Sequence, residues 1–111
     1  MSGDRDRAVY TSPGFARAYR EAMAHAFVQG PAGYARDTVL ATARWPFDPA
    51  EIRVPADIWY GADDASPVHS PDLGATLAAR IPGARRHVVP DAGGALLWTH
   101  AGPILETLLA R

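Results

Sequence analysis

Two short β-forming runs in the second half of the chain are separated by one segment of helical length, and this order limits the available folds. The first run, ADIWYG, follows Pro55 and ends at Gly61, and the second, RHVV, ends before Pro90. Runs rich in Val, Ile, Tyr and Trp that are bounded by Pro and Gly are typical of strands. Because a helix that joins two short strands implies a parallel pair, we expect an α/β fold with parallel strands at about residues 55–60 and 86–90.

The segment between the two runs, PDLGATLAARI, has the pattern of an amphipathic helix. Ser70 is a suitable N-cap, and Pro71 suits the first helical position, where a missing N–H costs nothing. The apolar side chains expected to face the core are Leu73, Leu77, Ala78 and Ile81. A last helix is expected from Pro103, and the stripe that would cover the sheet is Ile104, Leu105, Leu108 and Leu109. The predicted order after residue 55 is therefore strand, helix, strand, helix.

The first half of the chain predicts three further regions. Residues 1–12 are polar and are expected to form a flexible N-terminus. Residues 13–44 predict two helices, the first ending at Gly30–Pro31 and the second at about 32–43. The first helix has its apolar face at Phe15, Tyr19, Met23, Ala26 and Phe27. From residue 45 to Pro55 the prolines interrupt all periodicity, so this stretch is interpreted as a connector.

Composition narrows the function classes. The chain has 111 residues, 48% of them hydrophobic and 21% charged, which fits one ordinary globular domain. Its net charge is −1 and its arginines are scattered, so we expect neither a nucleic-acid nor a membrane partner. The chain has no cysteine, and its four histidines lack metal-ligand spacing, so no metal and no cofactor is predicted. The charged first residues do not form a signal peptide, and a cytoplasmic protein is expected.

The segments IRVPADIWYGADDASPV and LAARIPGARRHVVPDAGG together resemble the C-terminal part of α/β-hydrolase-fold proteins. The resemblance runs from about Trp45 to Leu109, so residues 45–111 would be a βαβα segment of that fold and residues 13–44 would resemble the end of its lid. In that family the loop after the first of these strands carries the acid of a catalytic triad, and the loop after the second carries the His. The resemblance places Asp64 at the acid position. Without it, Asp63 and Asp64 would be interpreted as turn-forming residues.

Two departures from the family pattern limit the chemistry. The nucleophile elbow, G-x-S-x-G, is absent, because none of the serines (Ser2, Ser12, Ser66 and Ser70) has glycines at that spacing. In addition, PDAGG puts Gly94 where the family has its catalytic His. His100, six residues further on, is the candidate replacement base, with an exposed or helix-capping His as the alternative. His25 is interpreted as a boundary residue, and His69 and His87 as exposed.

The sequence therefore predicts a truncated relative of ester and acyl hydrolases that has an incomplete triad and no catalysis of its own. One alternative is a non-catalytic binding module that forms a homodimer through an exposed strand edge. Another is the subunit of a split hydrolase whose N-terminal half is separately encoded. The remaining hypothesis is a small enzyme that uses Asp64 and His100 as acid and base.

Overall fold

The computed structural model of the chain describes residues 3–110, which form a mixed α/β structure that is mostly helical. Its two strands are β1 (Asp57–Gly61) and β2 (Arg85–Val89). Its helices are α1 (Asp4–Tyr10), α2 (Pro13–Ala26), α3 (Ala32–Thr42), α4 (Ala75–Arg80), α5 (Leu96–Thr99) and α6 (Ala101–Leu109), with a short 3-10 helix, η1, at Pro49–Glu51. The strands pair in parallel, from Asp57 opposite Arg85 to Gly61 opposite Val89. The predicted parallel pair is confirmed, with strand ends that differ from the expected ones by at most two residues.

The pairing continues beyond the strands and brings their two following loops together. Ala62 N–H donates to Val89 O, and Asp63 N–H donates to Ala92 O, each at 2.9 Å. Gly61 is suited to this approach, since a Cβ there would lie against the carbonyl groups of Ala92 and Gly93. The loops that follow β1 and β2 therefore meet at the C-terminal ends of the two strands.

The first residues depart from the prediction of a flexible terminus over 1–12, because Asp4–Tyr10 form α1. Contacts 85 or more residues distant in sequence hold this helix in place. Arg5 donates to Asp91, and the carboxylate of Asp6 accepts backbone N–H groups of Gly94 and Ala95. A polar segment at the start of the sequence gives no indication that its side chains contact residues near the other end of the chain.

The helix between the strands begins later than predicted. Residues 71–74 form turns, and α4 starts at Ala75 after Gly74, which has a left-handed φ of 76°. The reason lies in Asp72, whose carboxylate accepts from Gly74 N–H and Thr76 N–H, while the Ser70 hydroxyl also accepts from Gly74 N–H. Ser70 thus caps a turn and not the predicted first helical turn.

The core is small, and two predicted apolar faces are not buried. The buried apolar side chains are Ile81, Ala92, Ala95 and Leu96. Neither α2 nor α6 has a buried residue. Helix α6 contacts α5, a short helix that was not predicted, and Leu105, Leu108 and Leu109 of its apolar stripe remain exposed instead of covering the sheet.

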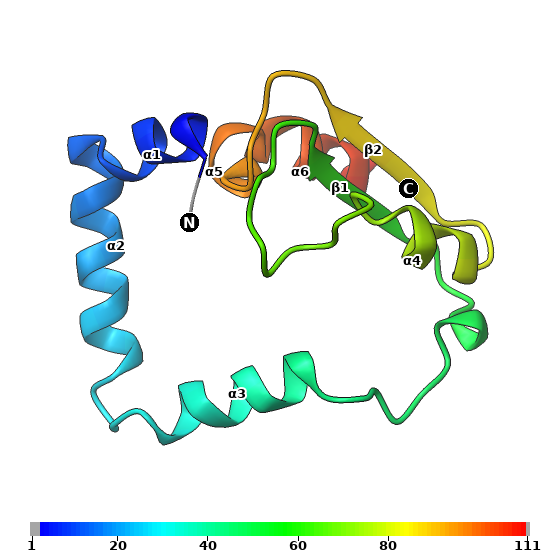
Figure 1. The fold of residues 1–111 in the computed structure, drawn as a ribbon, viewed down its shortest axis with the longest axis horizontal. Helices are drawn as coiled ribbons and strands as arrows, with labels where there is room; N and C mark the ends of the chain where they lie inside the picture. The colour runs from blue at the N-terminus through cyan, green and yellow to red at the C-terminus, as the bar shows by residue number, and fades with distance from the viewer. Residues whose placement is uncertain (1–2, 111) are drawn as a thin grey trace.

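Helices α2 and α3 extend away from the sheet in an open arc (Figure 1). The first turn of α2 contacts the body, where Phe15 packs edge-on against Trp98 at a centroid distance of 4.8 Å. The radius of gyration is 15.8 Å, whereas about 13 Å is usual for a compact domain of this length. Of the helices that the structure describes, none is long and apolar enough to cross a membrane.

Candidate acid–base site

Asp64 lies in the loop after β1, and this loop turns its carboxylate inward. The Asp64 N–H donates to Gly61 O at 3.2 Å, which closes a turn directly after the strand. The carboxylate then accepts the N–H of Ser66 at 3.0 Å, and only 4% of the Asp64 side chain is exposed. The residue at the expected acid position is therefore a buried, oriented carboxylate.

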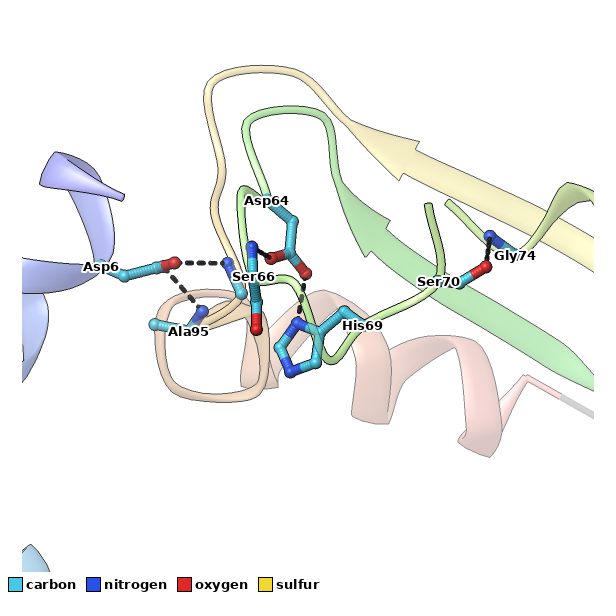
Figure 2. Close-up of polar contacts among 8 residues, drawn as sticks. Asp6, Asp64, Ser66, His69, Ser70, Gly74 and Ala95 are labelled. Atoms are coloured by element: carbon cyan, nitrogen blue, oxygen red, sulfur yellow. Dashed lines mark hydrogen bonds and ion pairs between the residues drawn. The ribbon is translucent and has the colours of Figure 1, made fainter. Parts of the chain in front are cut away.

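His69 comes back to Asp64 through a second turn. His69 N–H donates to Ser66 O at 3.2 Å, and Pro67 occupies the second position of this turn, where its fixed φ is favourable. The turn brings His69 Nδ1 to 2.6 Å from Asp64 Oδ2 (Figure 2). A carboxylate offers only acceptors, so Nδ1 carries the proton and Nε2 of the neutral ring is left as an acceptor.

Gly94, in the loop after β2, leaves the space that the His69 ring uses. A Cβ at Gly94 would lie 3.0 Å from His69 Cε1 and 3.1 Å from Asp64 Oδ1, which is tighter than ordinary contact. Gly94, the position at which the resemblance places a His, therefore lies next to Asp64. In this chain, however, the imidazole beside the acid comes from the loop after β1.

A cavity of about 370 Å³ adjoins this pair. Its lining includes Asp64, His69, Gly94 and several apolar side chains, among them Trp59 and Leu96. Volumes of this order accommodate small organic ligands. A larger, more open hollow of about 860 Å³ lies beside Trp45, but its Asp48 and Arg80 pair with each other at 3.1 Å, so we place the candidate site at the smaller cavity.

Helix α1 fastens the two loops that form the site. Asp6 is 3% exposed, and its two carboxylate oxygens accept Gly94 N–H at 3.0 Å and Ala95 N–H at 2.9 Å (Figure 2). Arg5 contacts the other side through Asp63, at 2.6 Å. At the end of α1, burial, followed by the negative charges of Asp6 and Asp64, raises the pKa of Tyr10. One helix turn therefore holds both loops and adds negative charge close to the site.

The other histidines lie elsewhere. His100 Nδ1 is hydrogen-bonded to Thr99 Oγ1 at 2.8 Å, and the ring lines a different cavity from that of Asp64. The structure thus does not bring the predicted base to the predicted acid, because α5 separates His100 from the loop at Gly94. His87 pairs at 2.9 Å with Asp57, the first residue of β1, and stacks on Trp59, its partner in the middle of the two strands.

The site pairs the His69 imidazole with the Asp64 carboxylate, and no serine hydroxyl within residues 3–110 is hydrogen-bonded to that imidazole. Ser70 lines the cavity, yet its hydroxyl donates to Asp72 at 2.6 Å. Ser12 donates to Val9 O at 2.7 Å, and Ser2 lies outside the described residues. Across residues 3–110, no hydroxyl is hydrogen-bonded to His69, and no three His, Asp or Glu side chains are grouped in a way that could hold a metal ion.

The structure and its site define a mixed α/β protein with a two-stranded parallel sheet and an Asp–His pair beyond the C-terminal end of β1. Comparisons of the chain with models of known families, with curated proteins and with solved structures find no match.

His69 was not identified from the sequence as the partner of Asp64. His69 was expected to be exposed, and 43% of its side chain is exposed in the structure. A signal was present in the segment DASPVH. An Asp two residues before Ser favours a side-chain turn, and Pro67 favours a second turn directly after it. Two successive turns over six residues return the chain toward its start, which is how residues 64 and 69 meet.

Proposed function

We propose that this chain carries the acid–base part of a hydrolase-type site and that the attacking group comes from outside its 111 residues. The observation that carries the proposal is the 2.6 Å hydrogen bond from His69 Nδ1 to the buried carboxylate of Asp64, beside Gly94. Asp64 holds the tautomer in which His69 Nε2 can accept a proton from a hydroxyl or a water. The apolar walls of the adjoining cavity suit an acyl group of an ester.

The free edge of β1 favours a subunit form of the same function. Within residues 3–110 each strand is paired on one edge only, since the sheet contains β1 and β2 alone. Unpaired strand edges bind further strands readily. A separately encoded polypeptide that paired there would extend the sheet and bring a nucleophilic serine, the part of the α/β-hydrolase pattern that this chain lacks.

The reaction of the chain with p-nitrophenyl acetate tests the acid–base assignment. We expect the protein to accelerate nitrophenolate release without a burst, because His69 is exposed and no serine is activated beside it. His69→Gln should abolish the protein-dependent rate. Asp64→Asn should lower it about tenfold, equivalent to about 1.4 kcal/mol in the barrier, since the ring is no longer held in the reactive tautomer.

His100→Gln and His25→Gln serve as controls, and both should retain the wild-type rate. Equal rates for wild type and His69→Gln would overturn the base assignment. Labelling of a serine in the isolated chain by a fluorophosphonate probe would overturn the claim that the attacking group lies outside it. In the subunit form, that labelling is expected only after a partner polypeptide with G-x-S-x-G is added.

A further inference from the structure

We propose that a second copy of this chain covers the helical arm, defined as residues 13–44, in a symmetric dimer. This proposal is independent of the acid–base function. All residues of α3, from Ala32 to Thr42, are exposed. An isolated helix of 11 residues is marginal in water, because most helical stability in proteins comes from packing. A stable α3 therefore needs a neighbour.

The accessible surface area of the chain indicates how large the interface with this neighbour would be. The accessible surface of the chain is 8273 Å², whereas a folded monomer of 11.9 kDa has about 6,000 Å². Each chain thus exposes an excess of about 2,300 Å², and two chains that covered it mutually would bury about 4,600 Å². Permanent homodimers typically bury 2,000–5,000 Å² or more, so the excess fits one dimer interface.

The side chains of the arm are suited to such an interface. Large apolar side chains are exposed along it at Tyr19, Val28, Tyr34, Val39 and Leu40. The arc in Figure 1 places α2 and α3 away from the sheet, where a second molecule can reach them. Permanent homodimer interfaces are richer in apolar contacts than other protein surfaces.

The charges of the arm favour a second copy over an acidic or basic partner. They are of both signs, with no large single-sign patch that would attract a nucleic acid or an anionic membrane: Arg17, Arg20, Glu21, Arg36, Asp37 and Arg44. Arg36 and Asp37 lie at the middle of α3. A two-fold axis between them sets two α3 helices antiparallel, with Arg36 of each copy opposite Asp37 of the other. Leu40, one turn after Arg36, lies on the same face of α3.

Size-exclusion chromatography with light scattering tests the proposal on the full chain. At micromolar concentrations the wild type should have twice the chain mass of 11.9 kDa. Tyr34→Glu and Leu40→Glu should each yield a monomer, because a buried carboxylate would replace an apolar contact. Leu109→Glu, an exposed position on α6 outside the arm, should remain a dimer.

A charge exchange keeps the test decisive if an arm variant fails to fold. Arg36→Asp and Asp37→Arg alone should each weaken the dimer roughly tenfold or more, since like charges then face each other. The double variant should regain the wild-type Kd. A monomeric wild type overturns the proposal, and so does a dimer whose Kd none of the arm substitutions changes. Either result leaves the ester-hydrolysis test of His69 unaffected.

Discussion

Asp6 is the residue that ties the beginning of the chain to the loop after β2. Its carboxylate accepts two backbone N–H groups, from Gly94 and Ala95, in a setting from which water is nearly excluded. Hydrogen bonds to a charged group each contribute about 1.5–3 kcal/mol. Asp6→Asn should lower the free energy of unfolding by about 2 kcal/mol, because the new amide group turns an N–H toward a backbone N–H. Urea denaturation measures this loss.

Asp4→Asn provides the matched control, since Asp4 belongs to the same helix turn but is exposed. Its effect should stay within about 0.5 kcal/mol, as for most surface substitutions. Equal effects of the two substitutions would show that Asp6 acts only through the charge at the start of α1 and not through its contact with the loop.

Single residues also show what could be inferred from the sequence at the site. Asp64 was placed at an acid position only through the resemblance, because an Asp after a strand and a glycine is by itself typical of a turn. Its partner was not identified, because His69 approaches it only through two turns whose combined path depends on several backbone angles. Gly94 was interpreted as a missing His through the resemblance alone, and its neighbours in the structure, Asp64 and His69, are set by the packing of two loops.

At the level of elements, the turn before α4 depends on an ionised carboxylate. The Ser70 hydroxyl, followed by the side chain and N–H of Thr76, holds the pKa of Asp72 well below its usual value of 3.8. The folded state therefore binds the proton less readily than the unfolded state. The stabilisation is present above about pH 4 and is lost as the pH falls further.

Denaturation at pH 6 and pH 3 should show this loss of stability in the wild type. Asp72→Asn should be less stable than the wild type at pH 6, and the difference should shrink at pH 3. Thr76→Val removes one side-chain donor and keeps the backbone N–H, so it should reduce the pH dependence only in part. A pH dependence unchanged in Asp72→Asn would contradict this account of the turn.

The elements themselves were predictable where the pattern is local. Both strands and helices α2 and α3 follow from β-forming runs and apolar spacing, but α2 ends at Ala26, before the predicted stop at Gly30–Pro31. Helix α1 was missed because its stability comes from Arg5 and Asp6 contacts with residues near the other end of the chain. Helix α5 was missed because four residues carry too little periodicity to indicate a helix.

For the whole molecule, the limited core and the extended arm both reflect how little apolar surface a single chain buries. Among residues 3–110 the buried apolar side chains are few, namely Ile81, Ala92, Ala95, Leu96 and Pro49, whereas the arm leaves large apolar residues in solvent. The sequence analysis expected the apolar faces of α2 and α6 to be buried, since periodicity shows that a face is apolar but not what covers it. A dimer through the arm would cover α2 and α3, and would leave the acid–base pair open to substrate.

The proposed acid–base site depends most on the hydrogen bond by which Asp64 holds His69. Nitrogen NMR of the His69 imidazole tests this bond directly. The ¹⁵N shifts and long-range ¹H couplings of His69 report which ring nitrogen carries the proton in the neutral form. We expect the proton on Nδ1 in the wild type, and mainly on Nε2 in Asp64→Asn. A wild-type His69 with the proton on Nε2, unchanged by Asp64→Asn, would contradict the acid–base site.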